Sequence, residues 1–154
     1  MQLWVALFYS VVLEPKRRVR AVDLLEVAGA AGLRAPSTVL STGNLLGEAA
    51  HSQRLVEQRL ERAAEAVLGK RIAVFCRSGV AFRQIVNDPP FSRRTPRRID
   101  PTQVSVRVMR RAPAPAIVER IASYCEPGDQ FFARDDALWL ITPRPFLERL
   151  PFQK

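Results

Sequence analysis

This chain of 154 residues has few of the residues that build metal-centred or covalent chemistry. It contains two cysteines, Cys76 and Cys125, and one histidine, His51. These three cannot supply four ligands to a zinc ion without carboxylates, and they follow no metal-ligand spacing. We therefore expect no metal ion and no cofactor, and we expect both cysteines to remain thiols in a cytoplasmic protein.

Recognisable catalytic and nucleotide-binding motifs are also missing. The chain holds neither a phosphate-binding Gly-x-x-x-x-Gly-Lys pattern nor a dinucleotide fingerprint. Ser10, Ser41 and Ser78 lie in no nucleophile-elbow pattern, and His51 has no nucleophile or acid near it in sequence. The sequence favours a protein that binds rather than catalyses. An enzyme assembled from residues distant in sequence is the alternative.

No apolar run reaches the roughly 20 residues that cross a membrane as a helix. The apolar stretch at 3–13 has no positive segment before it and no small-residue cleavage site after it, unlike a secretory leader. With 47% hydrophobic and 25% charged residues, the chain can bury a core and stay in solution. We expect a cytoplasmic protein that does not enter a membrane.

Positive charge is concentrated in the middle of the chain, whose formal net charge is +9. Residues 1–70 hold nine basic and seven acidic groups (+2), residues 71–111 hold ten arginines and two aspartates (+8), and residues 112–154 hold five basic and six acidic groups (−1). This pattern predicts a nucleic-acid or polyanion interface on a proline-stiffened loop and the polar side of the next strand. Its candidate residues are Arg93, Arg94, Arg97, Arg98, Arg107 and Arg111. The alternative is a solvated surface on an arginine-rich protein.

Apolar periodicity predicts an α+β fold built from two ferredoxin-like halves. The first half has the order strand, helix, strand, strand, helix, strand, which is the βαββαβ order of that sandwich. The first strand lies at 3–9 and the first helix at 20–31. Two strands flank a turn at 41–44, and the second helix at 52–69 and the last strand at 72–76 follow. The second half is an incomplete repeat. It has a helix after Ser78, a strand at 104–109, a helix after Pro113 and Pro115, a hairpin across Asp135-Asp136 and a last turn at 145–150.

The two halves should span residues 1–77 and 78–154, each with an antiparallel sheet and helices on one face. In the first strand, Trp4, Ala6 and Phe8 should face one way and Val5, Leu7 and Tyr9 the other. Both sides are apolar, and helices cover only one. The second side needs cover from the other sheet or from a second subunit, since exposed apolar patches favour association. We expect a homodimer.

A tight polar turn joins the apolar runs at 39–40 and 45–46. Its four residues are Ser41, Thr42, Gly43 and Asn44. Glycine and asparagine tolerate positive φ, which suits a hairpin, and the polar side chains can satisfy backbone groups that the turn leaves unpaired. In a second interpretation, the same groups hold an anion or a polar ligand at the end of the sheet.

The order of these features resembles the domain of unknown function family 1697. The most specific part is Ser-Thr-Gly-Asn at 41–44. The apolar first strand, the basic stretch at 16–18, the long helix closing at Gly69 and Asn-Asp-Pro-Pro-Phe at 87–91 also fit. The family has no established activity, so the resemblance implies a fold and no reaction.

Two departures from the family pattern bear on function. In family members the first strand is usually followed by Arg-Gly-Ile-Asn-Val-Gly-Gly, whereas this chain has Tyr-Ser-Val-Val-Leu-Glu-Pro at 9–15. A glycine-rich loop lets a ligand approach the backbone closely, and the segment in this chain cannot do so in the same way. The chain also reaches Lys154 without the Arg-Asn-Trp-Asn-Thr tail. We expect a divergent, shortened member that acts as a binding or interaction module. It could bind a ligand at the 41–44 turn, bind a polyanion, or serve as a dimeric scaffold.

Overall fold

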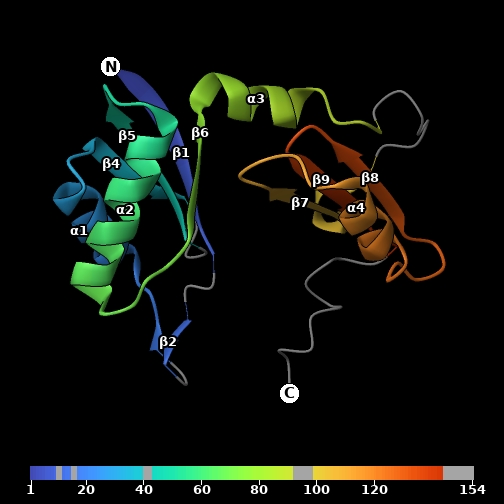
Figure 1. Ribbon diagram of the computed structural model, residues 1–154, viewed down its shortest axis with the longest axis horizontal. Coiled ribbons are helices and arrows are strands. Elements are labelled where there is room, and N and C mark those ends of the chain that lie inside the picture. The colour runs from blue at the N-terminus through green and yellow to red at the C-terminus, as the bar shows by residue number, and fades with distance from the viewer. Residues whose placement is uncertain (10–11, 15–16, 40–42, 92–98, 144–154) are drawn as a thin grey trace. The chain divides into compact units, whose positions relative to one another are not determined.

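The computed structural model describes residues 1–9, 12–14, 17–39, 43–91 and 99–143, and Figure 1 shows the course of the chain. The chain forms two compact units, Met1–Val86 and Asn87–Lys154. Both are mixed α+β with antiparallel sheets, as the sequence predicts. Helix α3 (Gly79–Asn87) follows the last strand of the first unit and reaches the start of the second. The predicted boundary at 77 and 78 stays a prediction.

The first unit has a four-stranded sheet with the strand order β4-β5-β1-β6. Its elements are β1 (Gln2–Phe8), α1 (Ala21–Ala30), β4 (Arg34–Val39), β5 (Asn44–Ala49), α2 (Gln53–Leu68) and β6 (Val74–Ser78). All neighbouring strands are antiparallel, which is the arrangement that a ferredoxin-like βαββαβ order produces. A small hairpin of β2 (Val12–Glu14) and β3 (Arg17–Arg18), which the sequence did not predict, is inserted after β1.

The core of the first unit lies between its sheet and its two helices. Trp4, Ala6 and Phe8 are buried in one cluster with apolar residues of α1 and α2, so the predicted alternation along β1 is confirmed. Each helix ends as predicted at a left-handed glycine, Gly32 (φ 78°) or Gly69 (φ 69°), where a side chain would be strained.

The N-terminal caps of the helices agree with the sequence less well. The hydroxyl of Ser78 accepts a hydrogen bond from Ala81 N–H at 3.1 Å, as predicted. Ser52 occupies the cap position of α2, but its side chain makes no capping hydrogen bond. At α1, the Asp23 carboxylate accepts from Arg20 N–H at 3.0 Å and forms an ion pair with the Arg20 guanidinium at 2.8 Å.

The second unit repeats this topology in shorter form. Its elements are η1 (Pro101–Gln103), β7 (Val104–Val108), α4 (Pro115–Ala122), β8 (Gln130–Arg134) and β9 (Ala137–Ile141). The strand order β7-β9-β8 matches β1-β5-β4 of the first unit, and no described strand takes the place of β6. The hairpin turn at Asp135 (φ 52°) is confirmed, and the predicted turn at 145–150 lies outside the described residues. The N–H and the hydroxyl of Thr102 both donate hydrogen bonds to the Asp100 carboxylate. These hydrogen bonds lower the pKa of Asp100, and the bond from the N–H caps η1.

The segment Asn-Asp-Pro-Pro-Phe that carries part of the family resemblance contacts the sheet of the second unit. The Phe91 and Phe132 rings lie 5.9 Å apart, centroid to centroid. Asp88 forms an ion pair with Arg134 at 3.4 Å, and its carbonyl accepts a hydrogen bond from the same guanidinium. Arg134 also lies 5.7 Å from the centre of the Trp139 ring. This segment therefore packs onto one face of the β8-β9 hairpin.

We predict that Phe91→Ala lowers the free energy of unfolding of the second unit by about 1 kcal/mol, because an aromatic pair contributes about that much beyond its buried area. The chain has two tryptophans, so in a Trp4→Phe background the urea transition of Trp139 fluorescence reports on this unit. Phe91→Leu keeps an apolar side chain and should lose less. Equal losses for both variants would contradict a role for the ring pair.

A candidate binding pocket in the second unit

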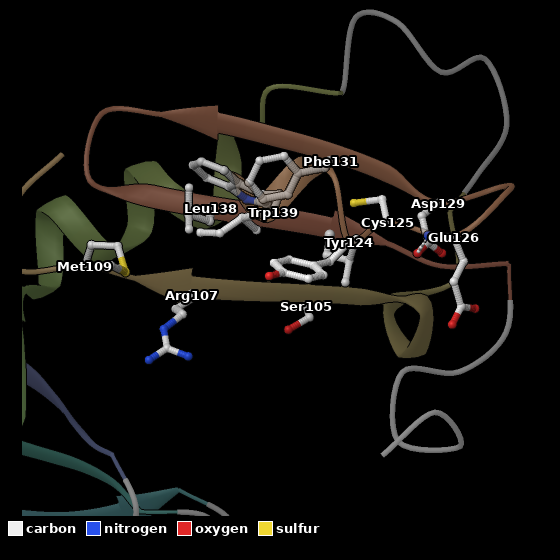
Figure 2. A pocket seen from close by; sticks show the side chains of 12 residues that line it. Ser105, Arg107, Met109, Tyr124, Cys125, Glu126, Asp129, Phe131, Leu138 and Trp139 are labelled. Atoms are coloured by element: carbon white, nitrogen blue, oxygen red, sulfur yellow. Dashed lines mark hydrogen bonds between the residues drawn. The ribbon is translucent and has the colours of Figure 1, made fainter. Parts of the chain in front are cut away.

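A pocket of about 680 Å³ lies within the second unit, between the sheet and the end of α4 (Figure 2). Apolar side chains form most of its wall, with polar groups at few positions. The lining residues are Ser105, Arg107, Met109, Ile121, Tyr124, Cys125, Glu126, Asp129, Phe131, Leu138, Trp139 and Leu140.

Strand pairing explains how the sheet contributes to this wall. Ser105 lies opposite Leu140 and Arg107 opposite Leu138, and Leu140 in turn lies opposite Phe131. Side chains of directly paired residues point to the same side of a sheet, so these five share one face. The face is apolar in its β8 and β9 part and polar along β7, which is an outer strand of this sheet.

The helix above this face stands away from the sheet. Neither Ile121 nor any other residue of α4 is buried, whereas α1 and α2 bury several residues, including Leu24 and Leu60. Exposed apolar side chains remain on and just after α4, with Ile117 at 47% and Tyr124 at 73% of their full exposure. Helix α4 therefore covers its sheet less closely than α1 and α2 cover theirs, and the pocket lies at the end of α4.

A hydrogen-bonded turn after α4 closes one border of the pocket. The Asp129 carboxylate accepts from Glu126 N–H at 2.9 Å, Asp129 N–H donates to the Glu126 carbonyl at 3.0 Å, and Gly128 takes a left-handed φ of 93°. Figure 2 shows both acidic residues at this border and Arg107 near another, with Tyr124, Phe131, Leu138 and Trp139 between them and Met109 beyond Arg107. The pocket thus has a positive border, a negative border and an apolar middle.

Two of the six arginines of the predicted polyanion interface lie among the described residues. Arg107 is exposed and lies at the pocket, and Arg111 is exposed in the bend that follows β7. Arg93, Arg94, Arg97 and Arg98 lie outside the described residues. The β7 face that carries Ser105 and Arg107 lines the pocket near the end of α4, and the polyanion interface stays a prediction.

One further arginine of the +8 segment does not contribute to a surface. Arg77 is only 4% exposed, and its Nη1 donates to the Cys76 carbonyl at 2.6 Å. It lies opposite Val5 on the side of the sheet that Trp4 and Ala6 do not share. Sequence position alone therefore overstates the basic surface.

The predicted turn site is only partly described. Ser41 and Thr42 lie outside the described residues. Gly43 has a φ of 88°, as its place in a tight turn predicts, and its carbonyl accepts from Phe8 N–H at 2.9 Å. Asn44 begins β5 opposite Leu7. Gly43 and Asn44 therefore lie beside the end of β1, and a ligand at the turn stays a prediction.

Other sequence expectations concern groups that could bind metal or cross a membrane. Cys76 is buried and Cys125 partly buried, and both carry thiols. Among the described residues, no group of three or more His, Cys, Asp or Glu could hold a metal ion. Within the same residues, no helix combines the length and the apolar character that spanning a bilayer requires.

The two units and the pocket define a class of small, two-unit α+β protein with a candidate binding pocket. The chain belongs to the family described as protein of unknown function (DUF1697), whose sequence pattern matches residues 1–139. This confirms the family resemblance. The search of curated proteins found no match.

A solved structure supports the same fold. The chain is similar to a conserved bacterial protein, SP0830 from Streptococcus pneumoniae, with a TM-score of 0.68 and 14% sequence identity. The similarity covers 98% of this chain and 88% of that one. At this identity the likeness establishes the fold alone, and neither the family nor this structure indicates a catalytic function.

Proposed function

We propose that the protein is a non-catalytic binding module and that its ligand is a small molecule with an apolar body, held in the pocket of the second unit. The observation that supports this is the pocket itself. Its volume of about 680 Å³ falls in the range of about 300–1,000 Å³ that small-molecule sites occupy. Such sites combine apolar walls with a few polar groups, as this one does.

The contrast between the units is a second line of support. Tyr124, which follows α4 and lines the pocket, is 73% exposed, although burial of such a side chain would stabilise the unit by roughly 1.5–3 kcal/mol. A ligand that fills the space below α4 would supply part of the missing apolar contact. Binding to the folded form should then raise the melting temperature, by an amount that grows with the logarithm of the ligand concentration once it exceeds Kd.

The test is a titration with N-phenyl-1-naphthylamine, an uncharged aromatic dye whose fluorescence rises in apolar sites. We predict saturable binding that Ile121→Trp weakens at least tenfold, because an indole at this position fills the pocket. Ile117→Trp is the matched control, since Ile117 lies on the same helix and outside the pocket lining. Absence of saturable binding, or equal effects of the two variants, would contradict the proposal.

Polyanion binding is a second candidate, which the exposed Arg107, Arg110 and Arg111 near the end of β7 favour. We predict that fluorescence anisotropy with labelled single-stranded RNA shows affinity that falls with salt, with a slope of about 0.7 per phosphate contact. Arg111→Gln should reduce that slope. Absence of binding at low salt would leave these arginines as solvated surface.

We also propose a homodimer in the cytoplasm. The side of the first sheet opposite the core carries exposed Leu3 and Val39, each 44% exposed, beside partly exposed Leu7, Leu46 and Phe75. Apolar groups gathered in this way favour association, and two thiol cysteines suit a reducing compartment. Light scattering at high micromolar concentration tests the assembly, and a monomeric mass would contradict it.

A further inference from the structure

We infer that the ligand of this pocket carries one negative charge at one end of an apolar body, with the charged group at Arg107 and Ser105. The inference rests on the proposed function, since it names the class of molecule that the same pocket would take. It depends on the distribution of charge around the pocket, which the proposed function does not use.

The positive border is built on a single strand. Ser105 and Arg107 are two residues apart on β7, so both side chains point to the same side and their Cα atoms lie roughly 6.6–6.8 Å apart. A hydroxyl and a guanidinium at this spacing can donate to one carboxylate, sulfonate or phosphate group. Arginine suits such groups because its donors form a planar fork that matches two oxygens of the anion.

The apolar part of the wall begins directly beside these donors. Leu138 and Leu140 are the paired neighbours of Arg107 and Ser105 on β9, and Phe131 follows on β8. A molecule whose anionic group meets β7 would therefore lay its body across the middle and the far strand of the sheet. This order of polar and apolar groups matches an amphipathic molecule such as an aryl or alkyl carboxylate.

The negative border limits the ligand to one charge. Glu126 and Asp129 lie at the turn after α4, and the Asp129 carboxylate is held in place by Glu126 N–H. A second anionic group at the far end of a ligand would meet these carboxylates, and like charges close together raise the free energy of the complex. The pocket should therefore prefer a monoanion over a dianion of the same length.

Two dyes with the same aromatic body test the first part of this inference. 8-Anilino-1-naphthalenesulfonate carries one sulfonate that N-phenyl-1-naphthylamine lacks. We expect the wild-type protein to bind the sulfonate dye about tenfold more tightly, and Arg107→Gln to remove this preference while leaving the affinity for the neutral dye within about twofold. Arg107→Lys should keep part of the preference, because it keeps the charge without the fork.

Arg120→Gln is the matched control for net charge, since Arg120 is an exposed arginine of α4 that does not line the pocket. It should leave the preference for the sulfonate dye unchanged. Far-ultraviolet circular dichroism of every variant separates lost binding from lost folding. If Arg107→Gln is unfolded, the preference for the sulfonate dye is measured with Arg107→Lys instead.

Competition tests the second part. Dodecanoate should displace the sulfonate dye at least tenfold more effectively than dodecanedioate, and Glu126→Gln should reduce that difference. Equal binding of the two dyes, or an effect of Arg120→Gln as large as that of Arg107→Gln, would overturn the inference while leaving the proposed function intact. If neither dye binds, the proposed function fails and the inference fails with it.

Discussion

Glu57→Ala is expected to lower the free energy of unfolding of the first unit by about 2 kcal/mol, because it leaves a buried backbone donor without its acceptor. Glu57 is one of few buried charged residues among those that the structure describes. Its Oε1 accepts from Cys76 N–H at 2.9 Å, and one turn along α2 the Oε1 of Glu61 accepts from Val74 N–H at 3.2 Å. Strand β6 is an outer strand, so these two donors point away from its neighbour β1 and toward α2.

The measurement is urea unfolding followed by tryptophan fluorescence. In a Trp139→Phe background the remaining tryptophan is Trp4, which is buried in the first unit, so the transition reports on that unit alone. Glu57→Gln keeps an oxygen acceptor and should lose less than the alanine variant. Glu65→Ala, on an exposed part of the same helix, should change stability by less than about 0.5 kcal/mol. Equal losses for Glu57→Ala and Glu65→Ala would show that the contact with Cys76 contributes nothing.

These carboxylates also protect the sheet from unwanted pairing. An outer strand presents backbone donors and acceptors that another chain can pair with, and native proteins block such strands with charges, proline or irregular backbone. The carboxylates of α2 do this at β6. At the opposite edge, β4 contains Pro36, and its pairing with β5 shifts register next to Ala35, which has a φ of 44°. These two edges of the first sheet are therefore poor interfaces for the proposed dimer. The side of this sheet opposite the core, which carries Leu3 and Val39, is the better interface.

Much of this fold follows from local sequence. Strand β1 and helix α2 carry strong alternating or helical periodicity, and Gly32 and Gly69 mark helix ends, so these elements were predicted within a few residues. The start of β4 at Arg34 was missed, because its pairing with β5 depends on tertiary contacts that a short apolar run does not reveal. Residue type alone also does not determine a capping hydrogen bond, since Ser52 stands at the N-cap of α2 without making one.

The pocket could not be predicted in the same way. Its residues come from three strands, the end of α4 and the turn that follows, and no local pattern connects them. Alternation along β7 did place Ser105 and Arg107 on one side of the strand. It did not show that this polar side would line a pocket with the end of α4. Because β9 is apolar on both sides, through Leu138 and Trp139, either face could receive the helix, and periodicity could not decide between them.

Gly47→Ala is expected to destabilise the first unit by about 2 kcal/mol, for a reason that the sequence alone does not show. Gly47 is buried in β5 opposite Trp4, on the face that packs against the helices. A Cβ atom placed there would lie 2.6 Å from Cδ2 of Leu33 and 3.1 Å from its Cβ. The first distance is far below van der Waals contact, and the second involves an atom fixed to the backbone, so turning the Leu33 side chain cannot remove the whole conflict.

A double-mutant cycle identifies the cause of that loss. Leu33→Ala alone should cost about 2–3 kcal/mol, since Leu33 is buried and its removal leaves a cavity. In the Gly47→Ala background the same change should cost at least about 1 kcal/mol less, because it removes the atoms that the new methyl group meets. Urea unfolding of the four proteins in the Trp139→Phe background measures each term. If the two losses simply add, the sheet accommodates the methyl group without involving Leu33, and the cost of Gly47→Ala must come from the strand backbone instead.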